Sequence, residues 1–243
     1  MIEQQLELHT QDGIADAVLY RPTENDSWPG VLHLTDIGGI RDSHRHMAER
    51  TASLGYIVMM PNVFYRTGRP PLFAAPFKPG DEQSMKRYSE LSKPLTPEAM
   101  QRDVGAYVDF LAAHESVAKK IGVVGYCFTG KMAVYAAALR PEKVKAVATF
   151  HGGGLYSDSP ASPHRLLQEI KARLYFGHAS NDRGMNAEAV EQLNQALAAW
   201  GGHYESEVYE GASHGWTVPD SPVYDPSQAE QALAKLTNLL SEM

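Results

Sequence analysis

The most reactive side chain of this sequence is that of its single cysteine, Cys127, in the stretch Gly125-Tyr126-Cys127-Phe128-Thr129-Gly130. The apolar run 121–124 before it predicts a buried strand, and the Ala-rich run 131–139 after it predicts a helix that ends before Pro141. A nucleophile on a sharp turn from strand to helix has this arrangement. The helix N-terminus would favour the reactive thiolate. A buried structural cysteine is the alternative.

A thiol nucleophile requires a base, and the base requires a group that orients it. Asp182 follows the predicted strand 172–176 in a polar loop, and His214 follows the next predicted strand, 204–209. The chain order cysteine, aspartate, histidine is that of the triad in α/β-hydrolases. We therefore predict that Cys127 is the nucleophile, that His214 is its base, and that Asp182 orients His214.

The elements that must position these residues alternate along the chain. Runs 6–9 and 14–20, separated by Asp12-Gly13, predict an antiparallel hairpin. Further strands are predicted at 31–34, 56–60, 121–124, 144–150, 172–176 and 204–209, and helices at 43–54, 97–114, 131–139, 186–200 and 226–240. This alternation predicts an α/β fold: a mostly parallel, twisted sheet of about eight strands with helices on both faces. Ligands of such sheets bind beyond the carboxyl ends of the strands.

One proline-rich segment, residues 64–96, interrupts the alternation, with a short helix predicted at 81–91. We expect a single domain over residues 1–243, with 64–96 as a lid-like insertion, since long loops in compact domains are often functional. A plain surface excursion is the alternative. The basic residues of the segment could meet an anionic substrate group or be merely solvated; they include Arg66, Arg69, Lys86 and Arg87.

The composition excludes several classes of protein. Hydrophobic residues make up 43% and charged residues 21% of the chain, which is typical of globular proteins. The net charge of −7 argues against nucleic acid or an anionic membrane as partner. A single cysteine excludes an internal disulfide and a cysteine-based zinc site. Neither a signal peptide nor a membrane span is predicted. We expect a cytoplasmic protein, monomeric or a small homo-oligomer, that acts on a small molecule.

These motifs resemble those of the dienelactone hydrolase (carboxymethylenebutenolidase-like) family, the cysteine branch of the α/β-hydrolase superfamily. The similar stretches are the cysteine motif 125–130, Asp182 and Gly211-Ala212-Ser213-His214-Gly215-Trp216. The resemblance extends from the first hairpin to the last helix. It implies hydrolysis of a small carboxylic ester or (enol-)lactone through a thioester on the cysteine, without metal or cofactor.

The tetrahedral intermediate of such a reaction needs two hydrogen-bond donors. Phe128, directly after the nucleophile, is predicted to supply one backbone N–H, and Ile37, in the loop after strand 31–34, the other. In the resembling family a glutamate at this loop pairs with the resting thiol. Asp36 stands at its position with a side chain shorter by one methylene. A loop-capping role is the alternative for Asp36.

The substrate pocket is predicted to be lined by Tyr126, His151 and Trp216, although Trp216 fits the core equally well. The family member that acts on dienelactone has an arginine four residues after its catalytic histidine and a serine directly after it. This chain has Val218 and Gly215 at those positions, so dienelactone itself is not the expected substrate.

Two other functions stay open at this point. Class I glutamine amidotransferases also carry a cysteine elbow, with His-x-Glu downstream. The string His203-Tyr204-Glu205 fits that pattern but lies at the start of a predicted strand instead of its carboxyl end. The other alternative is a non-catalytic ligand-binding protein on the hydrolase fold, which would have no physical need for Asp182 and His214 together.

Overall fold

The computed structural model describes residues 1–23, 27–74, 77–78 and 80–243. The strands of the described chain are β1 (Ile2–Thr10), β2 (Gly13–Arg21), β3 (Trp28–Leu34), β4 (Ile57–Pro61), β5 (Val117–Tyr126), β6 (Val144–Phe150), β7 (Arg173–Asn181) and β8 (Tyr204–Ser213). The helices are α1 (Asp42–Ala52), α2 (Glu82–Ser92), α3 (Pro97–Ala113), α4 (Gly130–Leu139), α5 (Ala187–Trp200) and α6 (Pro226–Ser241), with 3₁₀ helices at Cys127–Thr129 and Pro163–Glu169.

Within the described residues the strands form one eight-stranded sheet in the order β1-β2-β4-β3-β5-β6-β7-β8. The β1–β2 and β2–β4 pairs are antiparallel, and every pair from β4 to β8 in this order is parallel. The predicted α/β fold with its initial hairpin is therefore confirmed. The parallel strands share one carboxyl edge, where the loops after β3, β5, β6, β7 and β8 meet.

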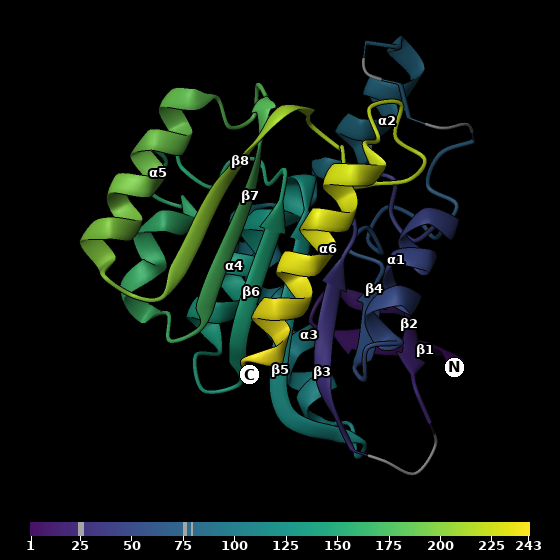
Figure 1. Cartoon of the computed structure of the whole chain (residues 1–243). Coiled ribbons are helices and arrows are strands. Elements are labelled where there is room, and N and C mark those ends of the chain that lie inside the picture. The colour runs from purple at the N-terminus through teal and green to yellow at the C-terminus, as the bar shows by residue number, and fades with distance from the viewer. Residues whose placement is uncertain (24–26, 75–76, 79) are drawn as a thin grey trace.

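Helices cover both faces of the sheet. In Figure 1, α6 crosses one face, and α1 lies on the same side. Apolar residues of these two helices, such as Ala48 and Leu236, bury against outward residues of the sheet such as Val58. Helices α3, α4 and α5 pack against the other face, in a second cluster that contains Val104 and Leu193. Because successive strand residues face opposite sides, β5 contributes Val123 to one cluster and Val124 to the other.

The long segment 64–96 contains α2, close to the predicted helix; its residues 75–76 and 79 lie outside the described chain. Two of its arginines contact groups elsewhere in the protein. Arg66 pairs with Asp103 and with Asp12, and Arg69 pairs with Asp16. These ion pairs anchor the segment to α3 and to the hairpin β1–β2. The lid function and the single-domain organisation stay predictions.

No helix of the described residues is both long and apolar enough to cross a membrane.

Candidate active site

Cys127 follows the last residue of β5 and begins the 3₁₀ turn that leads into α4. Its φ of 58° lies in the left-handed region, which non-glycine residues rarely adopt. The two flanking glycines make room for this turn. A Cβ on Gly125 would lie 2.6 Å from the Thr129 carbonyl oxygen, and one on Gly130 would lie 2.9 Å from Gly152 Cα. The sulfur-bearing residue is partly exposed, which contradicts the buried structural cysteine.

Hydrogen bonds hold the turn in place from two sides. The Thr129 hydroxyl accepts a hydrogen bond from Tyr126 N at 3.0 Å and lies 2.9 Å from the Leu34 carbonyl oxygen, to which it donates. On the other side, Cys127 N donates to His151 Nδ1 at 3.1 Å, and Gly153 N donates to the Cys127 carbonyl oxygen at 3.0 Å. The backbone of the cysteine is thus fixed by the loop after β6.

The structure brings the three predicted triad residues together. His214 Nδ1 lies 2.6 Å from Asp182 Oδ2, and its ring lies close enough to Cys127 to interact with it. The other carboxylate oxygen of Asp182 accepts a hydrogen bond from Gly184 N at 2.7 Å. The side chain of Asp182 is only 3% exposed, whereas that of His214 is 35% exposed. The aspartate is therefore held rigidly beneath an imidazole that solvent and substrate can reach.

The charge of His214 follows from its neighbours. Burial pushes the pKa of His214 downward, but the hydrogen bonds to Asp182 and Cys127 outweigh burial and raise this pKa to about 10. The imidazole is consequently protonated at neutral pH. A cationic imidazole beside a thiol stabilises the thiolate, as in other Cys–His pairs.

Both residues that we predicted as oxyanion donors lie at this edge of the sheet. Phe128 lies in the first turn after the cysteine, where a backbone N–H has no partner within the helix. Ile37 lies in the loop after β3, and its N–H has no acceptor among the described residues. Two free donors on neighbouring loops are what an oxyanion hole requires, and the role itself stays a prediction.

Asp36 contacts groups other than the thiol. Its two oxygens accept hydrogen bonds from Arg41 at 2.6 and 2.9 Å, and one of them also accepts from Gly38 N at 2.8 Å. Burial raises the pKa of Asp36, but the adjacent His44 and Arg41 outweigh it and hold this pKa well below its ordinary value. The hydrogen bond from Gly38 N to Asp36 caps the loop, as the alternative role for Asp36 predicted. Pairing of Asp36 with Cys127 stays a prediction, and these contacts speak against it.

Arg41 was missed in the sequence because nothing in its position marks it. Its guanidinium also binds Asp220, at 2.7 and 3.0 Å, and so joins the loop after β3 to the loop that follows His214. His44 is buried as well, with His33 Nε2 2.9 Å from its Nδ1. The hydrogen bonds of Arg41 with Asp36 and Asp220 thus fix the position of the Ile37 loop relative to the loop that contains His214.

Two further residues near Cys127 were missed. Lys131 of α4 and Tyr88 of α2 both lie close enough to Cys127 to interact with it electrostatically. Burial lowers the pKa of Lys131, while Cys127 acts in the opposite direction. Lys131 stands one helical turn after the cysteine, and this spacing was the signal in the sequence that could have identified it.

The three predicted pocket residues are all buried: Tyr126 is 4%, His151 1% and Trp216 0% exposed. The His151 ring stands between those of His214 and Trp216, with centroids 5.1 and 5.2 Å away. Trp216 therefore belongs to the core, the alternative left open by the sequence. His151 lies directly behind the ring of His214, and Trp216 lies behind His151.

The string predicted for an amidotransferase lies elsewhere. His203 directly precedes β8, whereas His214 directly follows it, so a whole strand separates His203 from the carboxyl edge that carries Cys127. Its position argues against a role in catalysis. Among the described residues, no group of three or more histidine, cysteine or acidic side chains is arranged to hold a metal ion.

The eight-stranded sheet and the cysteine elbow at its carboxyl edge define an α/β-hydrolase. The model of the dienelactone hydrolase family matches residues 15–243, and the chain belongs to this family. The expected ester or lactone hydrolase is confirmed at the level of this family.

Individual relatives agree with this assignment. Carboxymethylenebutenolidase of Rhodococcus opacus is 29% identical over 214 residues, which cover 85% of this chain and 80% of that protein. A candidate dienelactone hydrolase from Klebsiella pneumoniae superposes with a TM-score of 0.87 at 21% identity, over 100% of this chain and 99% of that one. A dienelactone hydrolase-like promiscuous phosphotriesterase from metagenomic libraries gives 0.80 at 20% identity, over 100% and 99% of the two chains. At these identities the two structures show the fold alone.

Proposed function

We propose that this protein hydrolyses a small carboxylic ester or lactone through a thioester on Cys127. The single observation that carries the proposal is the series Cys127–His214–Asp182 at the carboxyl edge of the sheet, in which His214 is hydrogen-bonded to Asp182 and interacts with Cys127. Such a series has a nucleophile, a proton carrier and an orienting anion in contact, which acyl transfer requires.

Acylation begins from the thiolate beside protonated His214. The sulfur attacks the carbonyl carbon, and the oxyanion that forms accepts hydrogen bonds from the N–H groups of Phe128 and Ile37. The bond to the leaving oxygen then breaks while His214 gives its proton to that oxygen. The product is an alcohol, or the freed hydroxyl or enol of an opened lactone, together with the thioester on Cys127.

Deacylation reverses these roles. The now neutral His214 takes a proton from a water molecule, which attacks the thioester carbonyl in the same oxyanion hole. Breakage of the carbon–sulfur bond releases the carboxylic acid and restores the thiolate beside protonated His214. Asp182 holds the Nδ1 proton of the ring throughout, so that Nε2 always faces the reacting atoms.

Lys131 and Tyr88 contribute to this cycle at the rim of the site. The Lys131 ammonium adds positive charge near the thiolate, and Tyr88 brings a half-buried phenol from α2 to the same place. Val218 is buried, and so cannot bind a substrate carboxylate as an arginine would. We therefore expect the substrate of this protein to differ from the dienelactone after which its relatives are named.

A hydrolysis screen tests the proposal. We expect turnover of at least one member of a panel of aryl esters, enol-lactones and thioesters. For substrates that are hydrolysed slowly, intact-protein mass spectrometry should detect a covalent acyl adduct of Cys127. The non-catalytic alternative predicts no turnover across the panel and slow alkylation of Cys127 by iodoacetamide at neutral pH. That pair of results would overturn the proposal.

The pH dependence provides an independent prediction. Because the pKa of His214 is raised to about 10, the acid that protonates the leaving oxygen is present throughout the neutral range and is lost only as the pH rises through about 10. We expect the rate of acylation to fall above that pH. In Cys127→Ala one of the groups that raise this pKa is removed, so an NMR titration of His214 should give a lower value than in the wild type. Equal values in the two proteins would contradict the proposed pairing.

A further inference from the structure

A pocket lies on the face of the sheet covered by α1 and α6, between these two helices. Its volume is about 170 Å³. The floor consists of Tyr126 and Phe150, which pair across β5 and β6, and the walls include Met47 and Arg50 of α1 and Leu233 of α6. Neither Cys127 nor His214 lines it. The pocket is thus separate from the catalytic residues.

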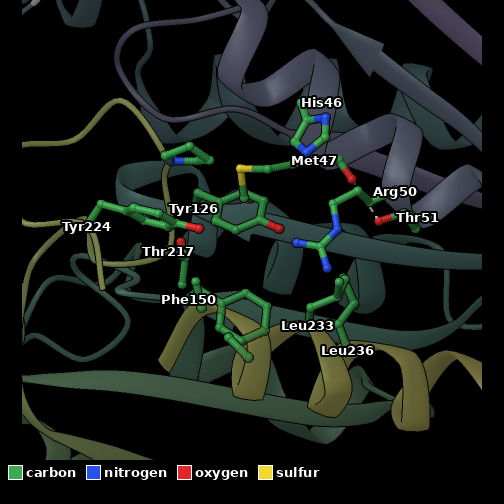
Figure 2. Close-up of a pocket in the computed structure, with 13 residues that line it drawn as sticks. His46, Met47, Arg50, Thr51, Tyr126, Phe150, Thr217, Tyr224, Leu233 and Leu236 are labelled. Carbon is green, nitrogen blue, oxygen red and sulfur yellow. Dashed lines mark hydrogen bonds between the residues drawn. The ribbon is translucent and has the colours of Figure 1, made fainter. Parts of the chain in front are cut away.

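The Tyr126 hydroxyl has an unusual environment. Tyr126 is 4% exposed, its ring stacks on Phe150 with centroids 5.7 Å apart, and burial alone raises its pKa. The hydroxyl forms no hydrogen bond with another described residue. Figure 2 shows this hydroxyl and the Arg50 guanidinium both pointing into the pocket. A buried phenol without a partner is costly unless a ligand or solvent completes its hydrogen bond.

The charges around the pocket favour an anion. Among the described residues that line it, none is acidic, while Arg50 is a permanent cation. Glu230 pairs with Arg50 at 2.6 and 2.7 Å, but its side chain is 57% exposed and lies outside the lining. An anion that reaches the pocket would therefore meet the Tyr126 hydroxyl and the Arg50 guanidinium, and would compete with Glu230 for the two terminal nitrogens of that guanidinium.

The size and the remaining walls restrict the ligand further. A cavity of about 150 Å³ with apolar walls accommodates one benzene ring. Here the ring would lie among Phe150, Met47, Leu233 and Leu236, and its acidic group would point to Tyr126 and Arg50. We propose that this pocket is a second ligand site for a monocyclic aromatic carboxylate of the size of benzoate.

The occupant would contact the framework of the catalytic site. Thr217, which lines the pocket, lies 2.9 Å from His151 Nε2, and His151 in turn accepts the hydrogen bond from Cys127 N. Tyr126 directly precedes Cys127. The proposed site therefore adjoins the backbone of Cys127. Its occupancy can be measured by ligand binding alone, without an assay of turnover.

The test is a ¹⁹F NMR titration with 4-fluorobenzoate and its neutral counterpart 4-fluorobenzamide, on protein whose Cys127 is alkylated. Alkylation blocks the catalytic site, so binding that survives it arises elsewhere. We expect 4-fluorobenzoate to bind the alkylated protein and 4-fluorobenzamide to bind at least about tenfold more weakly, since a charge-assisted hydrogen bond is lost. Arg50→Gln is expected to remove this preference.

A matched pair of variants on α6 locates the site. Ala229→Leu places three extra carbon atoms in the pocket lining and is expected to abolish binding, whereas Ala234→Leu, at an exposed position of the same helix, should leave it unchanged. Circular dichroism melting confirms that both variants fold. The proposal is overturned by no binding at millimolar concentrations, by binding that alkylation removes, or by equal binding to Ala229→Leu and Ala234→Leu. None of these results bears on hydrolysis by Cys127.

Discussion

Replacement of Cys127 by alanine is expected to lower the rate of ester or lactone hydrolysis by at least on the order of 10⁴-fold, since the nucleophile of a triad accounts for most of its effect. The free backbone N–H of Phe128 and the Ile37 loop remain in this variant. A small residual rate from binding and oxyanion stabilisation is therefore expected. Burst and steady-state kinetics with an aryl ester would measure both the loss and the missing acylation phase.

The variant is informative because alanine disturbs the turn little. Alanine keeps the Cβ that the φ of 58° already accommodates, and the contacts of Cys127 N with His151 and of its carbonyl with Gly153 involve only the backbone. Unchanged thermal stability with lost turnover would assign the loss to the sulfur. Cys127→Ser is the matched control, because a hydroxyl beside His214 retains a weaker nucleophile. Turnover near the wild-type rate in Cys127→Ala would contradict the thioester mechanism.

Replacement of Asp182 by asparagine is expected to lower the maximal rate by about 10³- to 10⁴-fold, with little change in substrate binding. The carboxylate is 3% exposed and accepts the Nδ1 proton of His214 at 2.6 Å. An amide nitrogen at this place would face the ring with a donor and favour the tautomer whose Nε2 carries the only proton. The ring would then lose both its positive charge and its alignment.

Separate measurements of kcat and KM distinguish this role from a structural one. The other oxygen of Asp182 accepts from Gly184 N, and asparagine can keep that hydrogen bond with its carbonyl oxygen. The fold should therefore persist. Asp220→Asn is a comparison variant: it weakens the pair with Arg41 that links the Ile37 loop to the histidine loop, but Asp220 has no contact with the ring of His214 among the described hydrogen bonds, so a much smaller loss is expected. Equal losses in Asp182→Asn and Asp220→Asn would argue for a general effect on the loops.

Local patterns in the sequence were sufficient to predict the fold and to select the three residues that we propose as a triad. The hairpin, the alternating strands and helices, and the turn around Cys127 depend on neighbours in the chain: apolar runs, Asp12-Gly13, and glycines beside the cysteine. The structure places Asp182 and His214 in contact because parallel strands bring their carboxyl ends to one edge. Their types and their positions after predicted strands were therefore enough to predict this contact.

Contacts between segments far apart in the chain could not be predicted in this way. Asp36 is the clearest case: its position suggested the thiol as partner, but Arg41 occupies both of its oxygens and links them to Asp220. Which of several possible partners a carboxylate binds depends on distances and rotamers that spacing does not encode. The sequence likewise left open whether Trp216 lines a pocket or lies in the core, and only the structure shows that it is 0% exposed.

The sequence by itself thus determined the sheet and the turn around Cys127 and selected the candidate site residues, because these follow from local propensity and from the order of elements. Only the tertiary structure decided what surrounds them. It placed His151 against the Cys127 backbone, directed Asp36 to Arg41, and left a pocket between α1 and α6 behind Tyr126. The physical reason is that packing and charge pairing act between residues that only the folded chain brings together.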